Sequence, residues 1–209
     1  FFGLLSVHTT VSAQEPFYKG KTVRVVVGFS AGGGFDTYSR SLARHMGKYI
    51  PGNPTFIVEN MPGAGSLIAA NHLFKVAKPD GLTLGIFNGN QILAQLLGGQ
   101  GIEFDARRFE WIGAPGKNHD RSLFSKESGV TSFERWMYAK SPVKLGGSAP
   151  GATTDDGPKA LKAALGLPLR VVAGYKGTSD IRRAVESGEL DGLCGLSWAS
   201  AKATWRKDI

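Results

Sequence analysis

Short apolar stretches alternate with longer amphipathic stretches along the chain, and this alternation predicts an α/β fold. The first apolar stretch, TVRVVV (22–27), has valines on both faces, which is typical of a strand covered on both sides in a parallel sheet. A helix should follow, because apolar side chains then recur at helical spacing. These side chains are Phe35, Tyr38, Leu42, Met46 and Tyr49.

The next stretches continue the same order and predict a βαβαβ unit. TFIVEN (55–60) and LTLGIF (82–87) are the second and third strands, and an amphipathic helix lies between them. Right-handed crossovers would put the three strands in one parallel sheet, with their carboxyl ends at one edge. The loops 29–34, 60–65 and 88–90 should therefore meet at that edge, and we expect a ligand cleft there.

From about Gly113 the composition changes, and a second alternation begins after the loop GAPGKNHD. We expect helices at 133–140, 153–166, 179–188 and 197–207, and strands at 143–147, 169–174 and 190–196. The order of strand, glycine-rich turn and helix thus repeats in the second half. Two α/β lobes that face each other predict a cleft between them.

Three consecutive glycines, Gly32, Gly33 and Gly34, connect the first strand to the first helix. At the amino end of a helix, unpaired N–H groups and the helix dipole favour anions, and glycine lets a ligand approach the bare backbone. No Lys follows, so this is not a nucleoside-triphosphate loop, and the GxGxxG spacing is absent. A small-anion cradle and a plain flexible turn both remain open. Asp36 in the first helical turn is typical of a residue that satisfies the dipole.

The second glycine-rich loop, GGSAPGATTDD (146–156), ends in residues that favour the start of a helix. Capping alone would explain Thr153, Thr154, Asp155 and Asp156, and a ligand role for the two threonines is the alternative. The two carboxylates would repel a simple carboxylate ligand, unless a cation, an ammonium group or hydroxyl donors lie between.

The composition narrows the function classes. The 209 residues, 42% hydrophobic and 20% charged, are typical of a soluble globular protein. The net charge is +8, and residues 106–209 carry most of it, with 17 of the 25 basic and 11 of the 17 acidic side chains. No basic run exceeds two residues, which argues against nucleic-acid binding and favours a surface that attracts organic anions.

Metal and thiol chemistry have little support. Cys194 lies in the apolar run LDGLCGL and is expected to be a buried core thiol. The histidines, His8, His45, His72 and His119, lack the spacing of metal ligands. We therefore expect no metal and no cofactor.

The first residues, FFGLLSVHTTVSA (1–13), are uncharged and end in a small-residue cleavage pattern, with Gln14 as the expected mature start. We interpret them as the remnant of a signal peptide; an N-terminal strand is the alternative. No later segment approaches the ~20 apolar residues of a membrane span. An exported, soluble protein is expected.

Several of these segments resemble one family. KTVRVVVGFSAGGGFD is similar to the opening strand and glycine loop of the Bug-type receptors, the extracytoplasmic substrate-binding proteins of tripartite tricarboxylate transporters. IVENMPGAGSLIAAN, AKPDGLTLG and GYKGTSDIRRAVESGELDG resemble later motifs of the same family. Their order and spacing carry the resemblance, which covers nearly the whole chain after residue 13.

The resemblance implies a two-lobed, flytrap-like periplasmic binding protein of type II. Residues 14–113 would form the first lobe and 114–209 the second. Such a protein is a non-enzymatic monomer that binds a small organic acid between its lobes and delivers it to integral membrane permease subunits. The family's ligand-binding positions fall on Phe29, Ser30, Ala31, Gly32, Gly33, Gly34, Asp36, Ser148, Gly151, Thr153 and Thr154.

The chain departs from the family pattern in three places. Prolines usually stand at Ser30 and Ala31, and commonly a His at Asp155, so the usual ligand class is in question. A C-terminal segment that returns to the first lobe is expected beyond Ile209, and without it part of the first sheet would be uncovered.

Two rival functions remain. An exported serine hydrolase of small esters or amides would use Ser148 or Ser197, but GxSxG and a His-Asp partner set are absent. A peripheral protein that binds acidic polymer through its basic second lobe is the other.

Overall fold

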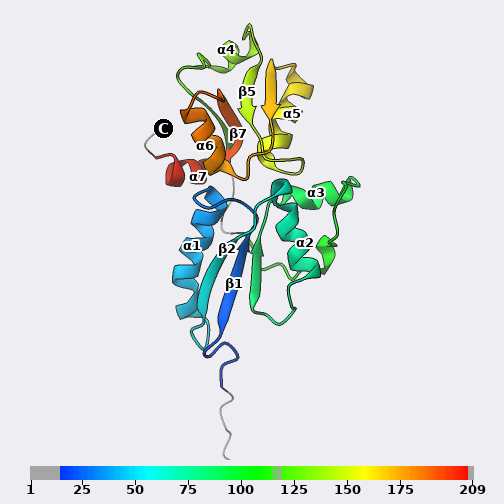
Figure 1. The fold of residues 1–209 in the computed structure, drawn as a ribbon, viewed down its shortest axis with the longest axis vertical. Coiled ribbons are helices and arrows are strands. Elements are labelled where there is room, and N and C mark those ends of the chain that lie inside the picture. The colour runs from blue at the N-terminus through cyan, green and yellow to red at the C-terminus, as the bar shows by residue number, and fades with distance from the viewer. Residues whose placement is uncertain (1–14, 115, 117–118, 207–209) are drawn as a thin grey trace, which may run out of the picture.

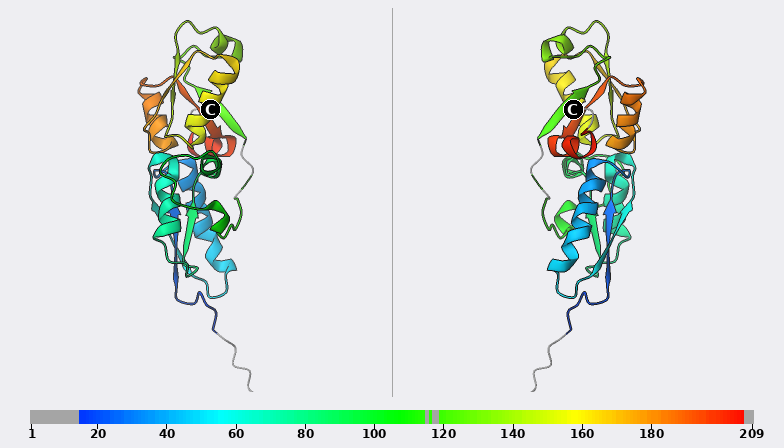
Figure 2. Two further views of the ribbon diagram at one scale, coloured as in Figure 1. Left: turned by 90° about the vertical axis from the view of Figure 1, so that its right-hand side faces the viewer. Right: turned by 90° about the vertical axis from the view of Figure 1, so that its left-hand side faces the viewer.

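Two α/β lobes are stacked along the long axis of the molecule (Figure 1), and the side views show them meeting end to end (Figure 2). The computed structural model describes residues 15–114, 116 and 119–206. The expected signal segment at 1–13 lies outside the described residues. The two-lobed α/β class is confirmed, and the boundary at residue 113 stays a prediction.

The first lobe contains a three-stranded parallel sheet in the order β2-β1-β3. The expected βαβαβ unit is therefore confirmed. Its strands and α-helices are β1 (Thr22–Val27), α1 (Gly34–Met46), β2 (Thr55–Asn60), α2 (Leu67–Lys75), β3 (Thr83–Ile86) and α3 (Asn90–Leu96). Short 3-10 helices cover Gly47–Tyr49, Ala64–Ser66 and Ala106–Arg108.

The centre of this sheet is buried as the valine pattern predicts. Val26 and Val27 of β1 are fully buried, because β1 pairs on both sides and helices cover it. The apolar face expected on α1 is less well covered, since Leu42 and Tyr49 are 41% and 77% exposed. The amino half of α1 contacts the last helix of the second lobe, Trp198–Thr204, and its buried polar residues Asp36 and Ser39 bond within the first lobe.

The second lobe contains a mixed sheet in the order β4-β7-β5-β6. Its elements are β4 (Asp120–Phe124), α4 (Phe133–Met137), β5 (Val143–Gly146), α5 (Thr153–Leu165), β6 (Leu169–Val172), α6 (Thr178–Glu186), β7 (Gly192–Ser197) and α7 (Trp198–Thr204). Strands β5, β6 and β7 are parallel, and β4 pairs antiparallel with β7. The sequence analysis missed β4, because its polar residues lie at an edge of the sheet.

The second core surrounds β5 and β7. Leu145 and Leu193 are fully buried, and Trp136 packs edge-on against Phe124 with ring centres 5.0 Å apart. Cys194 is 2% exposed, and burial raises the pKa of its thiol to about 11, although it accepts a hydrogen bond from Ser122. The expectation of a buried core thiol is confirmed.

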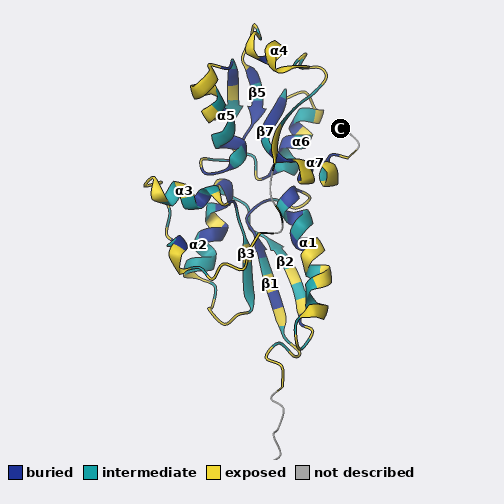
Figure 3. Cartoon of the chain, turned by 180° about the vertical axis from the view of Figure 1, so that it is seen from behind, coloured by how far each residue is buried: buried dark blue, intermediate teal, exposed yellow. Residues whose placement is uncertain are grey.

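Buried residues concentrate in β1, in the sheet of the second lobe and in the loops where the lobes meet (Figure 3). None of the helices in the described ranges is long and apolar enough to cross a membrane.

Gly192 tests how tightly β4 and β7 are paired. A Cβ at Gly192 would lie 2.1 Å from the carbonyl oxygen of Leu123, so Gly192→Ala should destabilise the second lobe by about 2 kcal/mol, the typical scale of overpacking. The measurement is the urea midpoint followed by circular dichroism. Gly157→Ala is the matched control, because a Cβ there meets nothing within 4 Å and alanine favours the helix. Equal midpoints for the two variants would contradict the observed strand pairing.

Candidate ligand site at the junction of the two lobes

The loops that follow the strands of both lobes meet at the junction. In the first lobe they follow β1, β2 and β3, and in the second they follow β5, β6 and β7. Parallel strands place their carboxyl ends at a common edge, and hydrogen bonds between the lobes show that the two edges face each other. The sequence-based expectation of converging loops is confirmed within the first lobe.

One contact joins the loop after β1 to the loop after β6. The backbone N–H of Ser30 donates to the carbonyl of Lys176 at 3.1 Å. The hydroxyl of Ser179 donates to the carbonyl of Ala31 at 3.0 Å and lies 3.1 Å from the hydroxyl of Ser30. Ser30 and Ala31, which stand where the resemblance implies prolines, thus bond directly to the second lobe.

A second contact joins the loop after β3 to the start of α5. The side-chain amide of Asn88 donates to the hydroxyl of Thr153 at 3.0 Å, and its backbone N–H donates to Ser66. Gln91 lies so close to Gly151 that a Cβ there would be 2.7 Å from its Nε2. Gly151 has a φ of 86°, so this position favours glycine for its backbone as well as for its space.

The triple glycine forms a third contact, with the amino ends of α6 and α7. A Cβ at Gly34 would lie 2.0 Å from the hydroxyl oxygen of Ser200, and one at Gly33 would lie 3.1 Å from that of Thr178. Because Gly33 and Gly34 have no side chain, the hydroxyl groups of Thr178 and Ser200 in the second lobe can lie close to their backbone. Whether a ligand also approaches these glycines stays a prediction.

Asp36 holds the triple-glycine loop in place. Its carboxylate accepts hydrogen bonds from the backbone N–H of Gly32 at 2.9 Å, from Arg40 and from Asn60. Burial of Asp36 opposes ionisation, but these hydrogen bonds and the Arg40 charge outweigh it and hold the pKa of Asp36 below its usual value. The same Asn60 amide donates to the carbonyl of Phe29, which ties β2 to the loop.

In the second lobe, too, a carboxylate in the first turn of a helix accepts a glycine N–H of the preceding loop. The carboxylate of Asp156 accepts from the backbone N–H of Gly151 at 3.1 Å. Ala152 is the N-cap of α5 and makes no side-chain cap bond, so the capping alternative is wrong for the hydroxyls of Thr153 and Thr154. A carboxylate that reaches back to the loop takes the place of the cap.

Asp155 is fully buried and forms an ion pair with Lys159. Its Oδ1 has no hydrogen-bond partner in the part of the chain that the structure describes. The hydroxyls of Thr154 and Ser148, both buried, lie 3.4 Å apart beside it.

All of the predicted ligand residues lie in the loops or helix ends at the junction. Phe29 is buried and stacks on Phe35 with ring centres 4.6 Å apart. The remaining residues make the contacts given above, across the lobes or within their own loop. These are Ser30, Ala31, Gly32, Gly33, Gly34, Asp36, Ser148, Gly151, Thr153 and Thr154.

The sequence analysis missed other polar residues at the junction. Five of them are Ser66, Asn88, Gln91, Ser179 and Ser200, and Ser197, which the sequence analysis named only as a nucleophile of the rival hydrolase, lies there too. Most of these are buried, and Asn88, Ser197 and Ser200 lie at or just after the carboxyl end of a strand. Position after a strand was the signal that would have found these three, because a buried polar side chain there needs a partner.

Two surface grooves lie away from the junction. One, of about 560 Å³, surrounds α4, and the other, of about 550 Å³, lies between α1 and β2. Neither is lined by a predicted ligand residue. No group of three or more His, Cys, Asp or Glu side chains in the described ranges is arranged to hold a metal ion.

The fold of the chain is similar to that of solved periplasmic binding proteins. No family model matches the chain. The periplasmic binding protein BugD is 26% identical, with a TM-score of 0.68 over 86% of this chain and 60% of its own. The chain has the Bug-type binding-protein fold. The resemblance noted in the sequence is therefore confirmed.

Two further proteins are similar to this chain, one in structure and one in sequence. MatC from Rhodopseudomonas palustris, solved with bound malate, is 23% identical, with a TM-score of 0.77 over 90% of this chain and 64% of its own. A UPF0065 protein from the gbd 5′ region of Cupriavidus necator is 42% identical over 72 residues, which are 34% of this chain and 21% of that protein. The chain thus spans less than two thirds of the length of these relatives.

We call the bonds of Asp36 to the Gly32 N–H and of Asp156 to the Gly151 N–H the two carboxylate clamps. Hydrogen exchange at these two amides should show that each clamp acts on its own loop. Asp36→Asn should raise the hydrogen-exchange rate of the Gly32 amide about tenfold, because an amide oxygen is a weaker acceptor than a carboxylate and Arg40 loses its partner. Asp156→Asn should do the same to Gly151 alone. Each variant is the control for the other, measured by NMR. If either variant raised the exchange rates of the Gly32 and Gly151 amides equally, each carboxylate would not act only on the loop of its own lobe.

The clamp at Asp36 also predicts a pH dependence. A carboxyl group whose pKa is lowered by folding stabilises the protein above its unfolded pKa of about 3.9, and this stabilisation is lost as pH falls through the lower folded value. The difference in unfolding free energy between wild type and Asp36→Asn should be constant near neutral pH and shrink below about pH 4. A difference that grew on acidification would contradict the assignment.

Proposed function

We propose that this chain is the two-lobed body of an extracytoplasmic receptor that binds a small organic acid between its lobes. The observation that carries the proposal is the meeting of strand-end loops from both lobes through hydroxyl and amide groups. MatC, which has the same fold, was solved with malate. A dicarboxylate of similar size is the first ligand to test.

The junction offers donors that suit a carboxylate. The hydroxyls of Ser30, Ser179 and Thr153 and the amide of Asn88 now bond directly across the junction. A ligand that enters between the lobes would take over such bonds, and each is worth about 0.5–1.5 kcal/mol net. Because these groups are neutral, the ligand is held without a fixed counter-charge and is released when the lobes separate.

The two acidic residues at the start of α5 oppose this ligand class less than two free carboxylates would. Asp156 is engaged by the Gly151 N–H, and Asp155 is compensated by Lys159 within its own lobe. Their charges are therefore already balanced or bonded before a ligand arrives. This weakens the objection that they would repel a simple dicarboxylate.

Delivery to membrane permease subunits from the periplasm, by a monomeric receptor, completes the proposal. A ligand that bridges the lobes favours the closed form by its difference in affinity for closed and open forms, and that closed form is what a permease would recognise.

We do not propose catalysis. The hydroxyl of Ser148 accepts a hydrogen bond from the hydroxyl of Thr154, and that of Ser197 accepts one from the backbone N–H of Ser200, so neither bond is to an imidazole or carboxylate that would serve as a base. This argues against the serine hydrolase alternative, which hydrolysis of a small ester or amide, lost in Ser148→Ala, would revive.

Gly33→Val tests the ligand site. Its side chain would crowd the hydroxyl of Thr178, where a Cβ already comes within 3.1 Å, so lobe closure on a ligand should be blocked. We expect affinity for malate or a similar dicarboxylate, measured by calorimetry, to fall at least about tenfold, which is 1.4 kcal/mol. The melting temperature should change little.

Gly157→Val is the matched control, because a Cβ at this position of α5 meets nothing within 4 Å. It should bind as the wild type does. If folded Gly33→Val bound the ligand with undiminished affinity, the triple glycine would not be part of the ligand site. Native mass spectrometry of gently purified protein would name a co-purified acid directly.

A further inference from the structure

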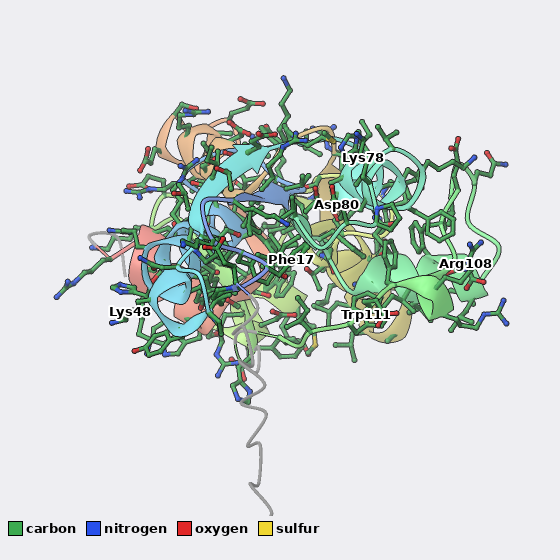
Figure 4. The ribbon with its side chains drawn as sticks, turned by 90° about the horizontal axis from the view of Figure 1, so that it is seen from below. Phe17, Lys48, Lys78, Asp80, Arg108 and Trp111 are labelled. Atoms are coloured by element: carbon green, nitrogen blue, oxygen red, sulfur yellow. The ribbon has the colours of Figure 1, made fainter. Side chains whose placement is uncertain are left out.

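A second surface with its own chemistry lies on the first lobe, between α1 and the edge strand β2. We call it the α1–β2 groove. It has a volume of about 550 Å³. The lining residues that matter here are Arg40, Arg44, Lys48, Phe56 and Val58. Figure 4, seen from below, places Lys48 beside the carboxyl end of α1.

The groove carries one sign of charge. Arg40, Arg44 and Lys48 follow each other at four-residue spacing along α1 and the turn after it, and no carboxylate is among the lining residues. Arg40 is paired with Asp36. Among the described residues no carboxylate pairs with Arg44 or Lys48, so two exposed cations remain uncompensated.

The similarly sized groove around α4 is a useful contrast. It contains Arg135 and Lys140, but also Glu127, Glu134 and Asp191. Its charges are therefore mixed, whereas those of the α1–β2 groove are not. A basic groove of this kind is complementary to an acidic partner.

The groove also contains an open strand edge. Strand β2 pairs with β1 alone among the described strands. The backbone N–H groups of Thr55 and Met61 donate toward β1, so alternation directs those of Phe56 and Val58 to the opposite side. Phe56 and Val58 are the strand residues that line the groove along with Thr55. Their outward backbone groups are a template for another strand.

The cations and the strand edge match in spacing. Arg44 and Lys48 are about one helical turn apart, close to 5.4–6 Å along the helix. Alternate residues of an extended strand are about 6.6–6.8 Å apart and point to the same face. A strand added to β2 would therefore present acidic side chains at alternate positions to successive cations.

We propose that the α1–β2 groove binds an extended acidic segment of a partner protein, which pairs with the outer edge of β2 and places carboxylates against Arg44 and Lys48. Backbone hydrogen bonds along an edge strand provide affinity in this mode, and the side chains at alternate positions provide selectivity. The inference does not depend on the ligand proposed for the junction, because the groove contains none of the residues predicted to bind it.

A labelled peptide of three Glu-Val repeats, blocked at both ends, tests the proposal by fluorescence anisotropy with the whole chain. Arg44→Glu/Lys48→Glu should weaken its binding at least about tenfold, because each reversal replaces an attraction of about 1 kcal/mol with a repulsion. Arg135→Glu/Lys140→Glu, in the groove around α4, makes the same change of charge and should leave binding unaltered. Equal weakening by both pairs would overturn the proposal, as net charge alone would then explain it.

A second peptide separates strand pairing from simple anion binding. Methylation of alternate backbone nitrogens keeps the carboxylates but removes donors to β2, so the affinity should fall at least tenfold when these nitrogens face the strand. Val58→Pro removes the matching donor of the protein, and circular dichroism would check its fold. Undiminished binding of the methylated peptide, or full displacement by pyrophosphate at equal charge concentration, would identify an anion site and overturn the strand proposal.

Discussion

The close approach of strand-end loops from two lobes is the constraint on which the junction depends. The strand-end loops of each lobe bring backbone N–H and C=O groups and polar side chains to the junction. Once buried there, these groups need hydrogen-bond partners. At Gly34 and Gly151 the absence of a side chain lets Ser200 and Gln91 come close enough to close the contact. The glycines therefore fix the distance between the lobes, and the hydroxyls fix their register.

Carboxylates at the start of α1 and α5 solve a related problem within each lobe. Gly32 and Gly151 have positive φ angles, which turn their N–H groups back toward the following helix. Asp36 and Asp156 accept these N–H groups at the positive end of each helix dipole, where a negative charge is favoured. Fixed loops can then present neutral hydroxyls and amides to a ligand, while the charges stay with the scaffold.

Much of the fold was predictable because its signals are local. The bounds of β2 match TFIVEN, and the valines of β1 indicated its central place in the sheet. Strand β4 was missed because DRSLF is mostly polar and is held by its neighbour β7. The exposure of Leu42 could not be predicted either, since spacing defines a helical face but does not say how much of it a second lobe will cover.

The site was predictable to a smaller extent. Topology alone indicated that the first-lobe loops converge, but contacts such as Ser30 with Ser179 depend on how two separately folded sheets are placed. The role of Asp36 was open between helix dipole and ligand, and its partners Gly32, Arg40 and Asn60 favour a positioning role.

The junction and the α1–β2 groove, the two surfaces of the first lobe discussed above, differ in charge. The sequence places most basic residues in the second half, yet Arg44 and Lys48, the cations that dominate the α1–β2 groove, belong to the first. Arg40 lies between the two surfaces: it lines the groove, and its guanidinium bonds Asp36 and Asn60 beside the triple-glycine loop. A partner that draws the Arg40 guanidinium into the groove would therefore remove a charged partner from Asp36, the carboxylate that accepts the Gly32 N–H.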